Sequence, residues 1–158
     1  MIRQTASMIA LTVVLCAPAA AETFSPAMTK AIQGFKLDTA GANAIIKTQG
    51  ELSQHVMKNP EAMKSLATTM KAPLEERIAL LGKDPAQSAV LKANGLGARD
   101  YSVGLIALRA AAWAVQGRSG PLTGLASPAN IGFLKANPAI LARFNEGEMG
   151  GGLLTKPR

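Results

Sequence analysis

Residues 98–116, ARDYSVGLIALRAAAWAVQ, are the stretch that decides the fold. Between Val103 and Val115 the only charged residue is Arg109. A helix that is apolar on nearly every side belongs in the middle of a bundle, and this apolar run is too short to cross a bilayer, which takes about 20 residues. Gly104 and the alanines along the stretch would let neighbouring helices approach closely. The sequence therefore predicts a central core helix.

Prolines indicate where the surrounding helices begin. At five positions a side chain that can accept a hydrogen bond is followed directly by proline, which is typical of a helix N-cap and the first helical residue. Proline lacks an N–H group that would be unpaired there in any case. The five steps are Ser25-Pro26, Asn59-Pro60, Asp84-Pro85, Ser127-Pro128 and Asn137-Pro138. They predict short helices joined by tight turns.

Apolar residues recur at helical spacing between these steps. The expected helices cover residues 39–58, 60–71, 85–94, 128–136 and 138–146, and one more opens at Pro73. Leu96, directly after Gly95, suits the hydrophobic contact of a Schellman-type helix end. No sustained alternating run rich in β-branched residues is present. We therefore expect an all-α fold, a compact bundle of about six or seven short helices around one central apolar helix.

The first 21 residues are typical of a secretory signal peptide. Arg3 precedes an apolar run at 8–17, and the alanines at 19–21 offer a cleavage site before Glu22. At about ten residues the apolar run is too short to span a bilayer, so we expect cleavage, a periplasmic or secreted protein, and no transmembrane span in the mature chain. The expected organisation is a signal peptide at 1–21, an N-terminal segment at 22–38, a helical domain at 39–146 and a flexible tail at 147–158.

Cysteine content and charge limit the possible chemistry. The single cysteine, Cys16, lies in the signal and follows the bulky Leu15, where a lipoprotein signal has a small residue. The mature chain would then have no disulfide, thiolate metal site or cysteine nucleophile. It would carry 16 basic and 10 acidic residues, a net charge of +6 that favours acidic partners. The basic residues are scattered without interleaved aromatics, which argues against nucleic acid. We expect an envelope protein, an anionic surface or a small apolar ligand as the partner.

Two separated motifs resemble those of a known group of proteins. LKANGL at 91–96 leads into RDY at 99–101, at the head of the central helix, and SPANIGFLK follows at 127–135. In this order the motifs resemble a group of small exported all-helical proteins of Gram-negative bacteria, and the likeness extends from Phe35 to Phe144. It implies a helical architecture and export. The group has no assigned activity, so the resemblance implies no catalytic residue.

The one histidine is the starting point for a metal hypothesis. His55 is followed by Met57, Met63 and Met70. Imidazole and thioether groups together suit copper, so these four residues are candidate ligands of an exported copper site. The alternative is that Met63 and Met70 pack in the core, because they share a helical stripe with Leu66, while the histidine is solvated. We expect no other cofactor.

Polar residues in and near the central helix are candidates for ligand binding. The ring of Tyr101 would pack in the core while its hydroxyl bonds across the bundle or touches a ligand. Arg109 is seven residues from both Ser102 and Gln116, which predicts a narrow exposed stripe; a buried Arg109 would instead need a paired acid or an anionic ligand. We expect Asn130 to make structural hydrogen bonds.

Catalytic signatures are absent from the sequence. There is no Gly-x-Ser-x-Gly elbow, and the adjacent carboxylates of Glu75 and Glu76 would point about 100° apart on a helix. We therefore expect a protein that is not an enzyme, namely a binding or interaction module of the cell envelope. The alternative is a copper or small-ligand carrier that uses His55 and the methionines. A groove beside the central helix would favour a carrier, and a fully packed bundle would favour a protein contact.

Overall fold

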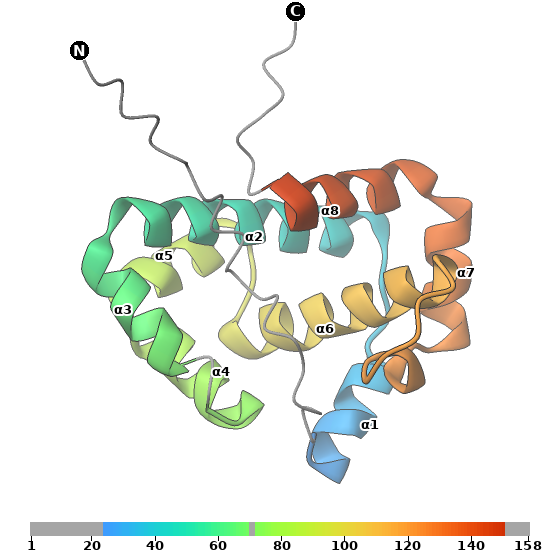
Figure 1. Ribbon diagram of the computed structural model, residues 1–158, viewed down its shortest axis with the longest axis horizontal. Coiled ribbons are helices and arrows are strands. Elements are labelled where there is room, and N and C mark those ends of the chain that lie inside the picture. Colours follow the sequence, from blue (N-terminus) through green and yellow to red (C-terminus); the bar gives the residue numbers. More distant parts are fainter. Residues whose placement is uncertain (1–23, 70–71, 151–158) are drawn as a thin grey trace, which may run out of the picture.

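The structure is a computed structural model that describes residues 24–69 and 72–150. Within these ranges it contains eight α-helices, one short 3-10 helix and no strand (Figure 1). The helices are α1 (Pro26–Gly34), α2 (Thr39–Lys58), α3 (Pro60–Thr69), α4 (Leu74–Lys83), α5 (Pro85–Ala93), α6 (Ala98–Val115), η1 (Thr123–Leu125), α7 (Pro128–Ala136) and α8 (Pro138–Gly150). The all-α prediction is confirmed. The expected signal peptide lies outside the described residues.

All five proline steps begin helices as predicted, and at four of them the residue before the proline caps the helix. Ser25, Asn59, Asp84 and Ser127 each accept a hydrogen bond from a backbone N–H in the first turn of α1, α3, α5 and α7 respectively. Asn137 differs, because its side-chain amide donates to the Phe133 carbonyl oxygen at 2.8 Å. This side chain therefore closes the end of α7 at the position from which α8 starts.

Glycines with positive φ end two of the helices. Gly95 has φ 71° and Gly117 has φ 67°. In the turn after α5 the N–H of Leu96 donates to the Leu91 carbonyl oxygen at 3.0 Å, which is the bond of a Schellman motif and confirms the expected helix end. By contrast, α8 continues to Gly150, four residues beyond the predicted end at Glu146. Residues 147–150 are therefore helical rather than part of a flexible tail.

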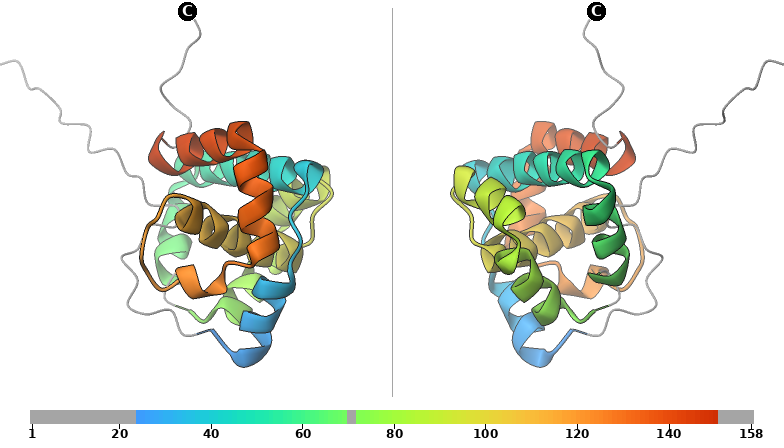
Figure 2. Two further views of the ribbon diagram at one scale, coloured as in Figure 1. Left: turned by 90° about the vertical axis from the view of Figure 1, so that its right-hand side faces the viewer. Right: turned by 90° about the vertical axis from the view of Figure 1, so that its left-hand side faces the viewer.

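Helix α6 lies at the centre of the bundle (Figures 1 and 2). Two apolar clusters pack against it. On one side Leu105 and Leu108 pack against residues of α2, α5, α7 and α8. On the other side Val103, Ile106 and Ala110 pack against α1, α4 and η1. The predicted central core helix is confirmed. Of the helices that the structure describes, none combines the length and the apolar character needed to cross a membrane.

Helices α2 and α8 lie side by side and run in the same direction (Figure 1). Arg143 Nη1 donates to Asn43 Oδ1 at 2.8 Å, and further along both helices Gln49 Nε2 donates to Glu148 Oε1 at 3.0 Å. The two bonds advance together along the pair of helices. They place the last turn of α8 beside the middle of α2.

The first connection of the chain is held by a buried side chain of α7. Asn130 is 2% exposed, accepts a hydrogen bond from Leu37 N–H at 3.0 Å and donates to the Phe35 carbonyl oxygen at 2.8 Å. Both ends of its amide are therefore used to satisfy backbone groups between α1 and α2. The structural role expected for Asn130 is confirmed.

Candidate functional site

The charged residue in the apolar part of the central helix is buried. Arg109 is 7% exposed, and its Nε donates to Glu148 Oε2 at 3.1 Å while its Nη2 donates to Glu148 Oε1. The predicted exposed stripe is therefore wrong for Arg109, although Gln116 on the same stripe is exposed. The physical reason is that the last turn of α8, which the sequence assigned to a tail, brings a carboxylate to this part of α6. The alternative prediction, a buried arginine with a paired acid, is what the structure contains.

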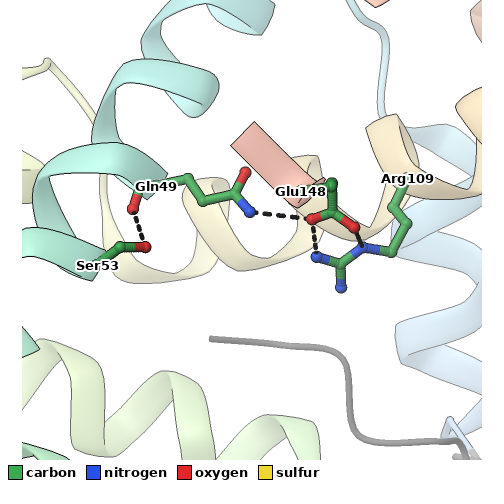
Figure 3. A network of polar contacts seen from close by, with 4 residues as sticks. All are labelled: Gln49, Ser53, Arg109 and Glu148. Atoms are coloured by element: carbon green, nitrogen blue, oxygen red, sulfur yellow. Dashed lines mark hydrogen bonds and ion pairs between the residues drawn. The ribbon is translucent and has the colours of Figure 1, made fainter. Parts of the chain in front are cut away.

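Three hydrogen bonds hold the Glu148 carboxylate (Figure 3). The third donor is Gln49 Nε2, at 3.0 Å from Oε1. In turn, Ser53 Oγ donates to the Gln49 carbonyl oxygen at 2.7 Å, one turn further along α2. The Glu148 side chain is only 16% exposed, so both partners of the ion pair are largely removed from water. We call Gln49, Arg109 and Glu148 the Arg109 cluster.

Tyr101 belongs to the apolar core at the start of α6. Its ring packs in the same apolar cluster as Leu105 and Leu108, as the sequence predicts for the ring. Burial raises the pKa of its phenol above the ordinary value of 10.0, and the charge of Glu148 adds to this effect while that of Arg109 opposes it. The phenol therefore stays protonated in neutral solution.

A second guanidinium lies near the Arg109 cluster. Arg77 of α4 is half-buried, and the loss of hydration lowers its pKa. The positive charge of Arg109 lowers the pKa of Arg77 further. Two arginines from different helices are therefore close enough for their charges to interact in the interior of the bundle.

A surface recess lies where the start of α2 meets the turn between α7 and α8. Its volume is about 400 Å³, and its lining includes Thr39 and Asn43 of α2 with Pro138, Ile140 and Arg143 of α8. Arg143 is exposed, and its bond to Asn43 fixes one nitrogen of the guanidinium. The residues that the sequence singled out for ligand binding do not line this recess.

The four predicted copper ligands are spread over two helices and a segment that is not described. His55 is half-buried near the end of α2, Met57 is 45% exposed, Met63 of α3 is half-buried, and Met70 lies outside the described residues. Across residues 24–69 and 72–150, no three His, Cys, Asp or Glu side chains form a group that could hold a metal ion. A site built on methionine sulfur is a separate question, so the copper hypothesis stays a prediction.

One of the two adjacent carboxylates on α4 has a structural partner. Ser25 Oγ donates to Glu75 Oε1 at 2.6 Å, and this hydrogen bond lowers the pKa of Glu75. The same Ser25 oxygen accepts from Met28 N–H, so it both caps α1 and ties it to α4. This contact explains Glu75 without a catalytic role.

No family model, curated protein or solved structure matches this chain. The resemblance to small exported helical proteins therefore stays a prediction.

Sequence reasoning missed Arg143 and its partner Asn43 altogether, and it missed the partners of Arg109. Asn43, Gln49 and Glu148 are ordinary polar residues in the sequence, and nothing local distinguishes them from solvated ones. One signal was present: a charge in the middle of an apolar helix requires an acid when it is buried. That signal calls for an acidic partner for Arg109 but does not select Glu148.

Proposed function

We propose that this protein is an exported binding module of the cell envelope, and that it holds an acidic segment of a partner protein in the recess beside Arg143. The observation that carries the proposal is an exposed guanidinium, oriented by Asn43, at a recess of about 400 Å³ between α2 and α8. Ligand pockets have volumes of about 300–1,000 Å³, so the recess can accept one or two side chains.

The packing around α6 favours a protein contact over a small-ligand carrier. Both faces of α6 are covered by apolar side chains, and a Cβ at Gly104 would lie 2.7 Å from Ile45 Cδ1. The recess lies at the surface, where Ile140 of the core cluster forms part of its lining. A partner is therefore expected to bind at the surface of the bundle.

Charge favours an acidic partner. A guanidinium has five N–H donors and binds carboxylates through two parallel bonds, and the bond to Asn43 uses one nitrogen of Arg143. The N-terminus of α2 at the recess is already capped by the Asp38 carboxylate, and the end of α7 also lines the recess, so Arg143 is the group that selects an anion there. An anionic bilayer would instead need several cations on one open surface, so a recess with one arginine suits a peptide segment better.

Site-specific crosslinking in exporting cells tests the proposal. A photo-reactive residue replaces Ala139, which lines the recess, or the exposed Ala89 on α5 as a matched control. We expect a discrete adduct with one envelope protein from position 139 and none from position 89. Charge reversal by Arg143→Glu should abolish the adduct, whereas reversal of another exposed arginine by Arg99→Glu should leave it unchanged.

Three results would contradict the proposal, the first two of which concern the protein adduct. One is an adduct that forms equally from both positions, because it would report random collisions. The other is an adduct that survives Arg143→Glu, because the recess arginine would then have no part in recognition. Adducts with lipid alone would indicate an anionic surface as the partner and would overturn the protein assignment.

A further inference from the structure

The Arg109 cluster has the form of a binding site that already contains its ligand. We propose that Arg109 and Gln49 form a carboxylate receptor, which Glu148 fills as an internal ligand. A carboxylate from outside the chain takes the place of Glu148 when the last turn of α8 unwinds. This receptor is distinct from the recess beside Arg143 and does not depend on the function proposed for it.

The geometry is that of complete carboxylate recognition. Two guanidinium nitrogens of Arg109 bond the two oxygens of Glu148, one each, and Gln49 adds a third donor to Oε1. Such parallel bonds give geometric specificity as well as binding energy. A planar group with two oxygens is therefore the ligand class that these donors select.

The receptor half of the cluster is fixed. Arg109 lies in the middle of α6, where Leu108 and Ala110 on either side of it are fully buried, so its backbone position is held by the core. Gln49 is buried on α2, and its backbone carbonyl accepts the bond from Ser53. Both donors therefore project from positions on core helices that do not depend on the last turn of α8.

The ligand half is loosely attached. Phe144 is the last buried apolar side chain of α8 among those that the structure describes, and Gly147 beyond it is exposed. The described side chains beyond Phe144 make polar contacts: the bond from Gln116 Nε2 to Asn145 Oδ1, 2.8 Å, and the bonds of Glu148. Glycine has low helix propensity, so the turn has little stability of its own.

When this turn opens, Arg109 loses its acid, and binding of another anion becomes favourable. A buried arginine without an acid is strongly unfavourable, whereas the intact pair contributes little net stability because both charges were taken out of water. Replacement of Glu148 by an equivalent carboxylate therefore costs little once the turn is released. The incoming group can belong to a free small acid or to an acidic side chain of a protein segment.

Removal of the internal ligand provides the test. In the full mature chain, Glu148→Ala should lower Tm by about 10 °C, because Arg109 loses its acid. Sodium propionate should restore much of this loss with a saturating dose response, while sodium chloride at the same ionic strength should not. The double variant Arg109→Met/Glu148→Ala should not respond to propionate, and Arg143→Met/Glu148→Ala should respond fully.

A second measurement on the unaltered chain covers the case in which Glu148→Ala does not fold. Hydrogen exchange of backbone amides 145–148 should become faster in propionate than in chloride, because the external acid releases the turn. A tetra-glutamate peptide compared with tetra-glutamine tests the second source of the carboxylate. The probe that acts at the lower concentration identifies the source.

The proposal is overturned if neither propionate nor tetra-glutamate acts on the Glu148→Ala variant or on exchange in the unaltered chain. An equal response in the variant that lacks Arg109 would overturn it too. If the response is lost in Arg143→Met/Glu148→Ala, propionate acts at the recess beside Arg143, and the receptor proposal is overturned.

Discussion

Gly104 is a position on α6 at which side chains of neighbouring segments come close. A Cβ there would lie 2.7 Å from Ile45 Cδ1 and 2.8 Å from Phe35 Cζ. Gly104→Ala should therefore destabilise the protein, because overpacking costs about 1–3 kcal/mol while the gain in helix propensity is about 0.5–1 kcal/mol. Urea unfolding at neutral pH measures the difference in the free energy of unfolding.

The matched control for this substitution is Gly132→Ala on α7. Nothing lies within 4 Å of a Cβ built at Gly132, so the substitution there changes only the helix propensity. This variant should be more stable than the unaltered protein by about 0.5–1 kcal/mol. Equal effects of the two substitutions would show that α2 does not press on α6 at Gly104.

Tyr101 makes the core sensitive to alkaline pH. It is the only tyrosine, and burial raises the pKa of its phenol above the ordinary value of 10.0. The folded state binds the phenol proton more tightly than the unfolded chain does. The stability that results is fully present below pH 10 and is lost as pH rises through the folded pKa. In an alkaline titration, phenolate absorbance should therefore appear only when Trp113 fluorescence reports unfolding. The urea-unfolded chain should instead titrate near pH 10.

At the scale of the helices, the stability of the N-cap that Asp84 forms on α5 depends on pH. The hydrogen bond from the Gln87 backbone N–H is the main cause that lowers the pKa of Asp84 below its ordinary value of 3.8. The resulting stability is present above pH 3.8 and is lost as pH falls through the folded pKa. Asp84→Asn keeps a capping side chain but loses the charge beside the helix N-terminus. At neutral pH this variant should be less stable by about 0.5 kcal/mol, and the difference should shrink at pH 3.

Urea unfolding of both proteins at several pH values checks this expectation. Glu146→Gln, which removes an exposed carboxylate from α8, is the control and should follow the unaltered protein. A constant difference between Asp84→Asn and the unaltered chain at all pH values would show that the charge of Asp84 has no part in the cap.

Helix starts were predictable, whereas the end of α8 was not. Four caps follow from a residue and the proline after it, because the capping bond is made within three residues of the cap. The end of α8 depends on a contact 39 residues away along the chain, between Arg109 and Glu148. Local signals, above all Gly147, favour an earlier stop. The buried ion pair is a tertiary contact that no helix pattern encodes.

At the scale of the whole molecule, the apolar stretch at 98–116 was sufficient to predict the architecture. A helix without a polar face has to be surrounded by other elements, and apolar residues of the neighbouring helices pack against α6 on both sides. The parallel placement of α2 and α8 could not be predicted in the same way. It depends on side-chain pairs such as Asn43 with Arg143, which are 100 residues apart. The candidate site was therefore found only in part: Arg109 from the sequence, its partners from the structure.

The chain as exported should begin at Glu22. Intact mass and N-terminal sequencing of protein from the periplasmic fraction should give a mature chain that has lost residues 1–21. Ala21→Phe should block cleavage and leave a longer precursor at the membrane, because the cleavage site requires small residues. A full-length chain in the cytoplasm would contradict the signal prediction and with it the proposed envelope role.

The hydrogen bonds between the N-terminal and C-terminal parts of the chain have a consequence for folding kinetics. Gln33 bonds to Gly124, Leu37 to Asn130 and Gln49 to Glu148, with separations of 91, 93 and 99 residues. A ribosome releases the N-terminal member of each pair long before the C-terminal one. During synthesis α1 and α2 therefore cannot form these contacts until residues 124–148 have left the ribosome. The bundle is completed only after the final quarter of the chain is present.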